Sequence, residues 1–228
     1  MFGNEYDIVR EYNTYFLDYQ EQYDAAARWT DRVISSSGDW SGNVYDFYFR
    51  VYNKLTQDIK VPFKLEGGTR VDDTRVHQAL REALANCLVN ADYYGRQELV
   101  IIQKKDGITL SNPGGFRIEI DAAKSGGISD PRNGTMLKMF NLIDIGERAG
   151  SGIPNIFRVW REQGWDEPTT RNIWMPTTHN FPIPAPLSGA GNEAYLLYFD
   201  ENLRDPDFCQ STETLLCTCT RKEHFYDQ

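Results

Sequence analysis

The sequence predicts an α+β fold, and three observations carry this prediction. Apolar residues recur at helical spacing in 43–58, at Val44, Phe47, Tyr48, Val51 and Leu55. A longer helix is predicted for 75–93, because Asp72-Asp73-Thr74 supplies N-cap residues before an apolar periodic run. Between 98 and 111, two apolar runs flank Lys105-Asp106-Gly107, a pattern typical of a β-hairpin.

The composition is that of a folded protein with an acidic balance. The chain has 228 residues, of which 40% are hydrophobic and 13% aromatic, enough to build a sizeable core. The formal net charge is -9. This charge argues against broad, non-specific binding to nucleic acid or to an anionic membrane, since both need a positive field.

Cysteine usage and hydropathy predict a soluble, cytoplasmic protein. Cys87 lies in an apolar helical pattern, whereas Cys209, Cys217 and Cys219 crowd the end of the chain, which is no disulfide framework. No apolar run reaches about eighteen residues, so we expect no membrane span. The start, MFGNEYDIVREYN, lacks the basic and apolar regions of a signal peptide.

Residues 1–60 are rich in aromatic side chains, and we interpret them as an aromatic-rich N-terminal linker region with a helix in 43–58. The rings are expected to pack into a core, with stacking of nucleobases as the alternative. A strand and a loop are expected at 59–68, before the long helix.

The second half alternates glycine turns with helical patterns. Asn112-Pro113-Gly114-Gly115 ends the hairpin, and 122–133 is small, polar and glycine-rich, which predicts a loop. Helices are expected at 135–143 and 153–162, the latter opened by Gly150-Ser151-Gly152. Prolines interrupt the pattern after Trp174, and 183–228 is expected to be a C-terminal appendage that is partly disordered.

The long helix carries the candidate chemistry. Glu82, Asn86 and Asn90 follow one another at spacings of four, along the edge of the apolar arc formed by Leu80, Ala83, Leu84, Cys87 and Ala91. Polar groups at a half-buried border need partners. A glutamate can act as a general base and an amide oxygen can bind Mg²⁺. The alternative is that these groups only bond to neighbouring loops.

The segments that follow favour a ligand site. Glycine at 114 and 115 lets backbone approach a ligand closely, because glycine has no Cβ. Gly150-Ser151-Gly152 precedes a helix whose N–H groups suit a phosphate. Each glycine pair alone is more often a turn, but their order after the Glu82–Asn86 helix is specific.

These segments resemble a known family. Their order is similar to that of the GHKL (Bergerat-fold) ATPases. More closely, REALANCLVNADYYG (81–95), ITLSNPGGF (108–116), SDPRN (129–133) and IGERAGSGIPNIF (145–157) resemble the RecG-like C-terminal, or divergent histidine-kinase-type, ATPase subgroup. Members are commonly attached to a Schlafen AlbA-like DNA-binding domain in bacterial transcriptional regulators. The resemblance covers about residues 1–181.

The resemblance implies a two-layer α/β sandwich over 61–182, with a mixed, mainly antiparallel sheet under helices and ATP between helix and lid. Glu82 would be the catalytic base and Asn86 the Mg²⁺ ligand. Residues 125–148 would form the lid, with Arg132 as a phosphate contact. The remaining residues expected to bind ATP are Asn90, Asn112, Gly114, Gly115, Gly150, Ser151 and Gly152.

The sequence departs from the family pattern at the adenine box, where the wider superfamily has an aspartate and this chain has Asn112. An asparagine accepts a hydrogen bond without the strength that a carboxylate's charge adds. No G-x-x-x-x-G-K-[ST] loop for a helicase is present, and 183–228 does not read as a winged helix. DNA binding would therefore belong to a domain that this chain lacks.

Two functions remain open from the sequence. The first is an ATP-binding module of a bacterial transcriptional regulator, with slow Mg²⁺-dependent hydrolysis. The second is a catalytically inactive regulatory or dimerisation module, which would be a homo-oligomer. A zinc site in the tail from Cys209, Cys217, Cys219 and His224 is a further alternative, though its spacing matches no usual zinc motif. His77 and His179 stand alone and are expected to be core or surface residues.

Overall fold

The structure is a computed structural model that describes residues 1–24, 26–57, 59, 65–66, 69–70, 74–146, 150–172 and 177–183. A six-stranded sheet forms its base, with the strand order β2-β1-β5-β6-β8-β7. The strands are β1 (Leu17–Glu21), β2 (Asp31–Ile34), β5 (Leu99–Lys104), β6 (Gly107–Asn112), β7 (Thr169–Asn172) and β8 (Thr177–Pro182). The short strands β3 (Leu65–Glu66) and β4 (Thr69–Arg70) pair with each other in a separate ribbon.

The sheet is mixed and mainly antiparallel. Only the neighbours β1 and β5 run parallel, with Leu17 opposite Leu99, whereas the other neighbouring strands are antiparallel. A parallel pair needs a long crossover connection, and here the connection contains two helices. The hairpin β5–β6 confirms the prediction made from the Asp106-Gly107 pair, with Lys104 opposite Gly107 across a two-residue turn.

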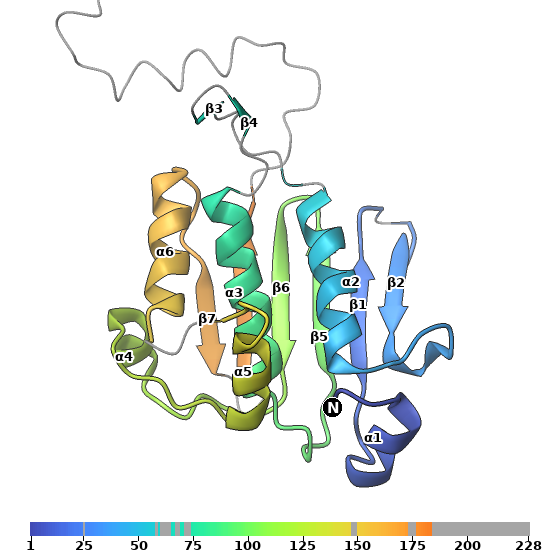
Figure 1. The fold of residues 1–228 in the computed structure, drawn as a ribbon. Coiled ribbons are helices and arrows are strands. Elements are labelled where there is room, and N and C mark those ends of the chain that lie inside the picture. The colour runs from blue at the N-terminus through green and yellow to red at the C-terminus, as the bar shows by residue number, and fades with distance from the viewer. Residues whose placement is uncertain are drawn as a thin grey trace, which may run out of the picture. The chain divides into compact units, whose positions relative to one another are not determined.

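Helices cover one face of the sheet, so the molecule has the two layers that the resemblance implied (Figure 1). The long helices α2, α3 and α6 lie side by side over the strands. The helices are α1 (Glu5–Glu11), α2 (Val44–Gln57), α3 (Arg75–Asn90), α4 (Ile120–Ser125), α5 (Gly134–Asn141) and α6 (Gly152–Glu162), and a 3₁₀ turn spans Ser35–Ser37. None of the helices in the described ranges is both long and apolar enough to cross a bilayer.

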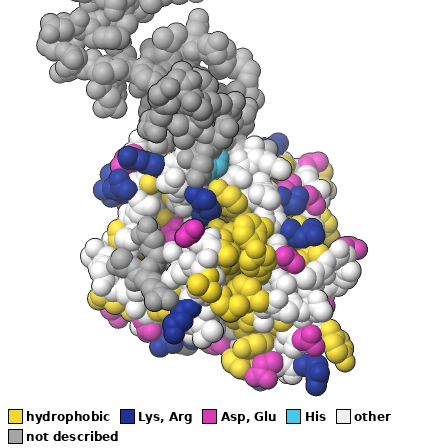
Figure 2. Space-filling view, viewed as in Figure 1, with side chains coloured by type: hydrophobic (Ala, Val, Ile, Leu, Met, Phe, Trp, Pro, Cys, Tyr) yellow, Lys and Arg dark blue, Asp and Glu magenta, His cyan; other side chains and the backbone are white. Residues whose placement is uncertain are grey.

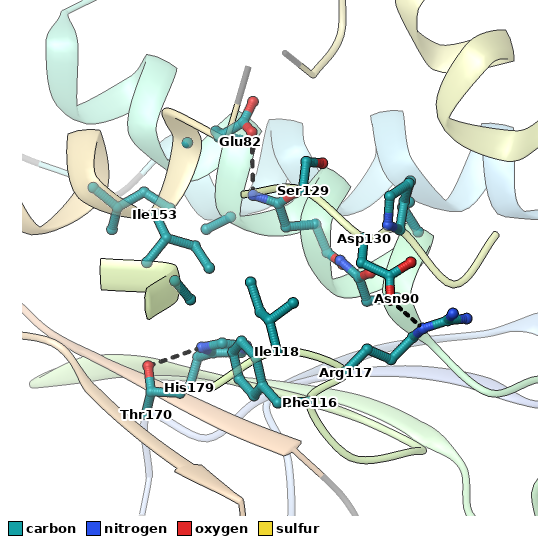
Figure 3. A pocket seen from close by; sticks show the side chains of 18 of the residues that line it. Glu82, Asn90, Phe116, Arg117, Ile118, Ser129, Asp130, Ile153, Thr170 and His179 are labelled. Carbon is teal, nitrogen blue, oxygen red and sulfur yellow. Dashed lines mark hydrogen bonds and ion pairs between the residues drawn. The ribbon is translucent and has the colours of Figure 1, made fainter. Parts of the chain in front are cut away.

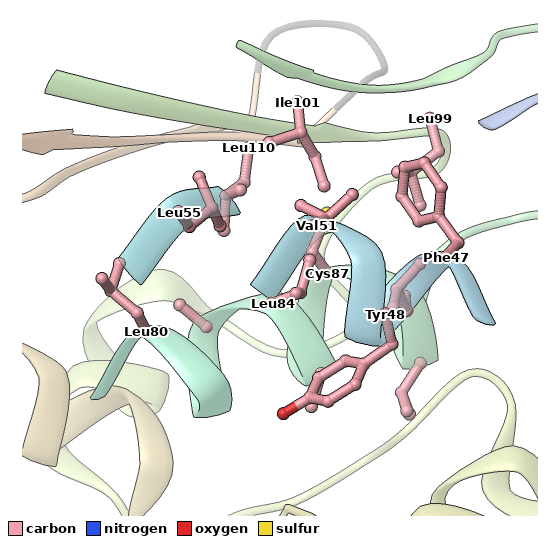
Figure 4. Packing of buried hydrophobic residues seen from close by; sticks show 14 of the residues in the cluster. Phe47, Tyr48, Val51, Leu55, Leu80, Leu84, Cys87, Leu99, Ile101 and Leu110 are labelled. Atoms are coloured by element: carbon pink, nitrogen blue, oxygen red, sulfur yellow. The ribbon is translucent and has the colours of Figure 1, made fainter. Parts of the chain in front are cut away.

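Helix α3 is the centre of the core (Figure 4). It packs against α2, α5, α6 and strand β6. The apolar arc expected from its sequence is buried, and so are residues on its flanks, including Ala85, Leu88 and Val89. A helix enclosed on so many sides leaves only a narrow strip for polar residues. Burial of its leucines is worth about 1.5–3 kcal/mol for each side chain.

Two expectations from the sequence need correction, and four strands of the six-stranded sheet were not predicted. The expected loop at 122–133 contains the end of α4, because Ala122 and Ala123 continue a helical turn up to Gly126, where φ is +82°. Helix α3 ends at Asn90, short of residue 93. The pattern of β1, β2, β7 and β8 was missed because polar residues occupy many positions in these short strands. The strand expected at 59–65 and the appendage expected at 183–228 lie largely outside the described residues.

Candidate functional site

A cavity lies between α3, the sheet and the segment 115–132 (Figure 3). Helix α3 and the start of α6 form one side, and strands β6, β7 and β8 form the other. The sequence-predicted residues that line it are Glu82, Asn86, Asn90, Asn112, Gly115, Arg132, Gly150 and Gly152. Gly114 and Ser151 are absent from the lining, although both are chain neighbours of lining glycines.

The polar strip of α3 faces this cavity, and its three side chains are half-buried as the sequence predicted. Asn86 Nδ2 donates to Glu82 Oε1 at 3.1 Å, so the amide nitrogen faces the carboxylate. Asn90 Nδ2 donates to the Asn86 carbonyl at 3.0 Å, and Asn90 Oδ1 accepts from Arg132 N at 3.2 Å. Asn90 is therefore engaged in protein contacts, whereas the Asn86 side-chain oxygen is directed away from Glu82.

Helix α6 approaches α3 so closely at Gly152 that a larger residue there would displace the Glu82 side chain. A Cβ at Gly152 would overlap Glu82 Oε1. Two residues earlier, Gly150 has a φ of +65°, and a Cβ there would lie 2.7 Å from the Ile128 carbonyl oxygen. The two glycines thus bring the start of α6 against the Glu82 carboxylate on one side and against the 128 backbone on the other.

The start of α6 leaves donor groups beside that carboxylate. The first N–H groups of a helix have no intrahelical acceptor and carry the positive end of its dipole. In α6 these belong to Gly152 and Ile153, since Pro154 has no N–H and Asn155 N donates to Ser151 O. Both residues line the cavity, so this end of the cavity favours negative charge.

Arg132 and Asn133 join the predicted lid to the end of α3. Arg132 Nε donates to the Asn90 carbonyl at 3.1 Å, and its Nη2 donates to the Gly115 carbonyl at 2.9 Å. Asn133 Nδ2 donates to the carbonyls of Val89 and Ala91, at 2.9 and 2.7 Å. These donors satisfy carbonyls that the helix end leaves unpaired. A phosphate contact by Arg132 remains a prediction, because its guanidinium here holds backbone carbonyls.

The turn after β6 places a nearly buried amide in the cavity wall. Asn112 is only 3% exposed, and its Nδ2 makes one long contact, 3.4 Å, with the Pro113 carbonyl. Gly114 follows with a φ of +91°, and a Cβ there would lie 3.0 Å from Arg132 Nη2. The Asn112 amide therefore remains available to a ligand at this end of the cavity.

The lining also includes residues that the sequence did not assign to a site. His179 of β8 and Thr170 of β7 lie on the sheet side, opposite Glu82 in Figure 3, and Phe116 lies beside His179. His179 Nδ1 is 3.2 Å from Thr170 Oγ1. Desolvation by the surrounding apolar residues lowers the pKa of His179 from 6.5 to about 4, so the ring is neutral near pH 7. Both residues were overlooked because their strands were not predicted.

Some expected features lie outside the residues that the structure describes. Residues 147 and 148 of the predicted lid and all the tail cysteines lie outside the described residues. Within the described ranges, no group of three or more His, Cys, Asp or Glu side chains could hold a metal ion. An ion held by Asn86 would therefore depend on ligand oxygens and water for the rest of its coordination.

Comparisons with known proteins agree with this architecture. Residues 97–178 match the family described as "Putative ATP-dependent DNA helicase recG C-terminal", which confirms the resemblance over this segment. The segment contains the glycine turns, Asn112 and Arg132, but it begins after Glu82, Asn86 and Asn90. No curated protein matches the chain.

The fold is also similar to that of a solved structure. The DIP2311 protein from Corynebacterium diphtheriae aligns with a TM-score of 0.59 and 15% identity, over 75% of this chain. The alignment covers 35% of that protein, so this chain spans about a third of its length. At this identity the likeness concerns the fold alone.

Replacing Gly152 by alanine should force the Glu82 carboxylate out of its position. Because a Cβ would overlap Oε1, we expect Gly152→Ala to lower the free energy of unfolding by about 1–3 kcal/mol. In a Glu82→Ala background, Gly152→Ala should lower the free energy of unfolding much less. A double-mutant cycle measured by chemical denaturation would detect this difference. Gly134→Ala is the matched control, since Gly134 also begins a helix but has open space around its Cβ position. Additive effects of the two substitutions would contradict the close contact.

The lowered pKa of His179 predicts a specific loss of stability in acid. Between pH 6.5 and about 4 the unfolded chain binds a proton at this histidine more readily than the folded protein does. The free energy of unfolding should therefore fall as the pH falls through this window. His179→Gln removes the titration, so its unfolding free energy should decline less steeply than that of the wild type over the same range. Parallel pH profiles for the two proteins would show that His179 titrates normally.

Proposed function

We propose that the chain is an ATP-binding module that holds Mg-ATP in the cavity between α3 and the sheet. The observation that carries the proposal is the meeting of the α3 polar strip with the glycine-opened start of α6 in one cavity. The family match over 97–178 supports it, since the description of that family names an ATP-dependent enzyme. The phosphates would lie at the α6 end and the base near Asn112.

Asn86 is the proposed magnesium ligand. Its amide nitrogen donates to Glu82 Oε1, which leaves the amide oxygen, a hard neutral donor, for the cation. The N–H groups of Gly152 and Ile153 would donate to phosphate oxygens, and Asn86 would hold the cation that supplies positive charge there. This arrangement offsets the negative charge that Glu82 and the nucleotide phosphates would otherwise bring together.

Glu82 is the proposed catalytic base for slow hydrolysis. Its carboxylate contacts Asn86 and lies against Gly152, so a water beside it would be near the terminal phosphate. A positioned base of this kind contributes about 10²–10⁴-fold to a rate. Asn112 would read the adenine edge as a neutral donor and acceptor, in place of the carboxylate of the wider superfamily.

The wider role that we propose is nucleotide sensing in a bacterial transcriptional regulator. An acidic chain with a net charge of -9 is a poor non-specific DNA binder, so DNA contact would belong to another domain. ATP would then act as a ligand that shifts the regulator between states, and the cavity of this module would be the sensor.

Calorimetry with Mg-ATP tests both parts of this proposal. We expect the wild type to bind Mg-ATP, with weaker binding when Mg²⁺ is chelated or in Asn86→Ala. Glu82→Gln should keep binding and lower the hydrolysis rate by about 100-fold. Glu162→Gln, on the exposed side of α6, is the matched control and should change neither quantity.

The proposed nucleotide binding and the proposed catalytic role of Glu82 can be refuted independently. A wild-type protein that neither binds nor hydrolyses Mg-ATP would refute the nucleotide function. Binding with a hydrolysis rate that Glu82→Gln leaves unchanged would remove the catalytic role and retain the sensor.

A second candidate function, a dimerisation module, is favoured by one surface. Exposed apolar side chains of α2 and the α5 end gather on the helical face, as Figure 2 shows. This apolar surface consists of Tyr45, Phe49, Met139, Leu142 and Ile143. Phe2 packs against Tyr45 of this surface and against the buried Phe140 of α5, with ring centroids 6.0 and 5.8 Å away. Large exposed apolar surfaces commonly mark protein interfaces.

Light scattering after size-exclusion chromatography tests the dimerisation module. If the apolar surface joins two copies, the wild type should become a dimer as its concentration rises. Phe49→Glu or Leu142→Glu should then keep it monomeric, because a buried unpaired charge costs several kcal/mol. Tyr6→Glu, at an exposed tyrosine of α1, is the control. A wild type that stays monomeric at every concentration would exclude this function.

A further inference from the structure

The sheet side of the cavity contains a polar pair that neither the family resemblance nor the sequence assigned to a role. Thr170 and His179 are opposite residues of β7 and β8, and their side chains meet with 3.2 Å between Oγ1 and Nδ1. Both line the cavity. The contact ties the imidazole to the neighbouring strand, so its orientation is set by the register of the sheet.

The register also places His179 on the same sheet face as Asn112. On β8, His179 is opposite Leu110, and residue 177 is opposite Asn112. Side chains two residues apart in a strand share a face, so Leu110 and Asn112 point to the same side, and His179 joins them. The amide and the imidazole therefore belong to one wall of the cavity.

The surroundings of the imidazole suit a flat heterocycle. The Phe116 ring lies 5.6 Å from the His179 ring, edge to face, and the Phe181 ring lies 6.3 Å away, nearly parallel. Thr170 engages Nδ1, and no hydrogen bond joins Nε2 to any described residue. An aromatic wall that carries one polar atom provides stacking and edge contacts for a nucleobase.

We propose that His179, oriented by Thr170, reads the edge of the nucleobase together with Asn112 and sets the base specificity of the site. This inference rests on the proposed nucleotide binding. A neutral imidazole offers one hydrogen-bond function at Nε2, and the Asn112 amide offers a donor and an acceptor. Together these neutral groups complement the adenine edge, which presents an amino donor beside ring-nitrogen acceptors.

Substitutions at the pair test this role by calorimetry with Mg-ATP and Mg-GTP. We expect His179→Phe to raise the Kd for Mg-ATP about ten-fold, as the loss of one hydrogen bond predicts. The same variant should reduce the preference between ATP and GTP. For His179→Gln, which keeps a polar group near the Nε2 position, the Kd for Mg-ATP should stay within about three-fold of the wild-type value. The Kd of Thr170→Val for Mg-ATP should lie between those of the two His179 variants, because this substitution removes the Thr170 hydroxyl that orients the imidazole and keeps the imidazole itself.

Histidine NMR gives a readout that a merely structural role would not move. The chain has three histidines, so the His179 ring nitrogens can be assigned. Mg-ATP should shift the Nε2 resonance of His179 and leave that of His77 unchanged. An unshifted Nε2 resonance in a protein saturated with Mg-ATP, or an unchanged Kd and ATP/GTP ratio in His179→Phe, would overturn the proposal. If the wild type binds no nucleotide, the proposed function itself fails, which is a different result.

Discussion

The contact between α6 and α3 at Gly152 sets the geometry of the whole candidate site. The Glu82 carboxylate occupies the space that a Cβ at residue 152 would need, so the two helices meet in this arrangement through a glycine. That approach brings the positive end of α6 next to a negative side chain on α3. Everything else at this end of the cavity, including the Asn86 amide and the 128 backbone against Gly150, is arranged around this contact.

A second constraint acts at the other end of α3. The helix stops at Asn90, and its last carbonyls are taken by Arg132 and Asn133 from a segment some forty residues later. The same arginine bonds the Gly115 carbonyl, so helix end, lid and glycine turn form one unit. A motif such as SDPRN can therefore be required for structure as well as for a ligand. Asn90 likewise has a structural role, since both its amide nitrogen and its amide oxygen form hydrogen bonds within the protein.

The sequence predicted the parts of this molecule whose signals are local. The α2 and α3 periodicities, the Asp106-Gly107 hairpin and the half-buried position of Glu82 and Asn86 were all visible in short windows. Strands β1, β2, β7 and β8 were not, because they are short and polar residues at many of their positions hide the alternation. The place of His179 in the site was missed for the same reason. A lone histidine indicates no site until the strand register places it on the same sheet face as Asn112.

The sequence therefore predicts the residues on one side of the cavity better than those on the other. The α3 side is built from one helix, and spacing alone brings Glu82, Asn86 and Asn90 together. The sheet side is assembled from β6, β7 and β8, so its recognition groups meet only after long-range pairing is formed. If Asn112 and His179 choose the base while Glu82 and Asn86 handle the phosphates, then specificity and chemistry reside on different layers. Changes on the strands could then alter the ligand of the fold without disturbing its α3 site.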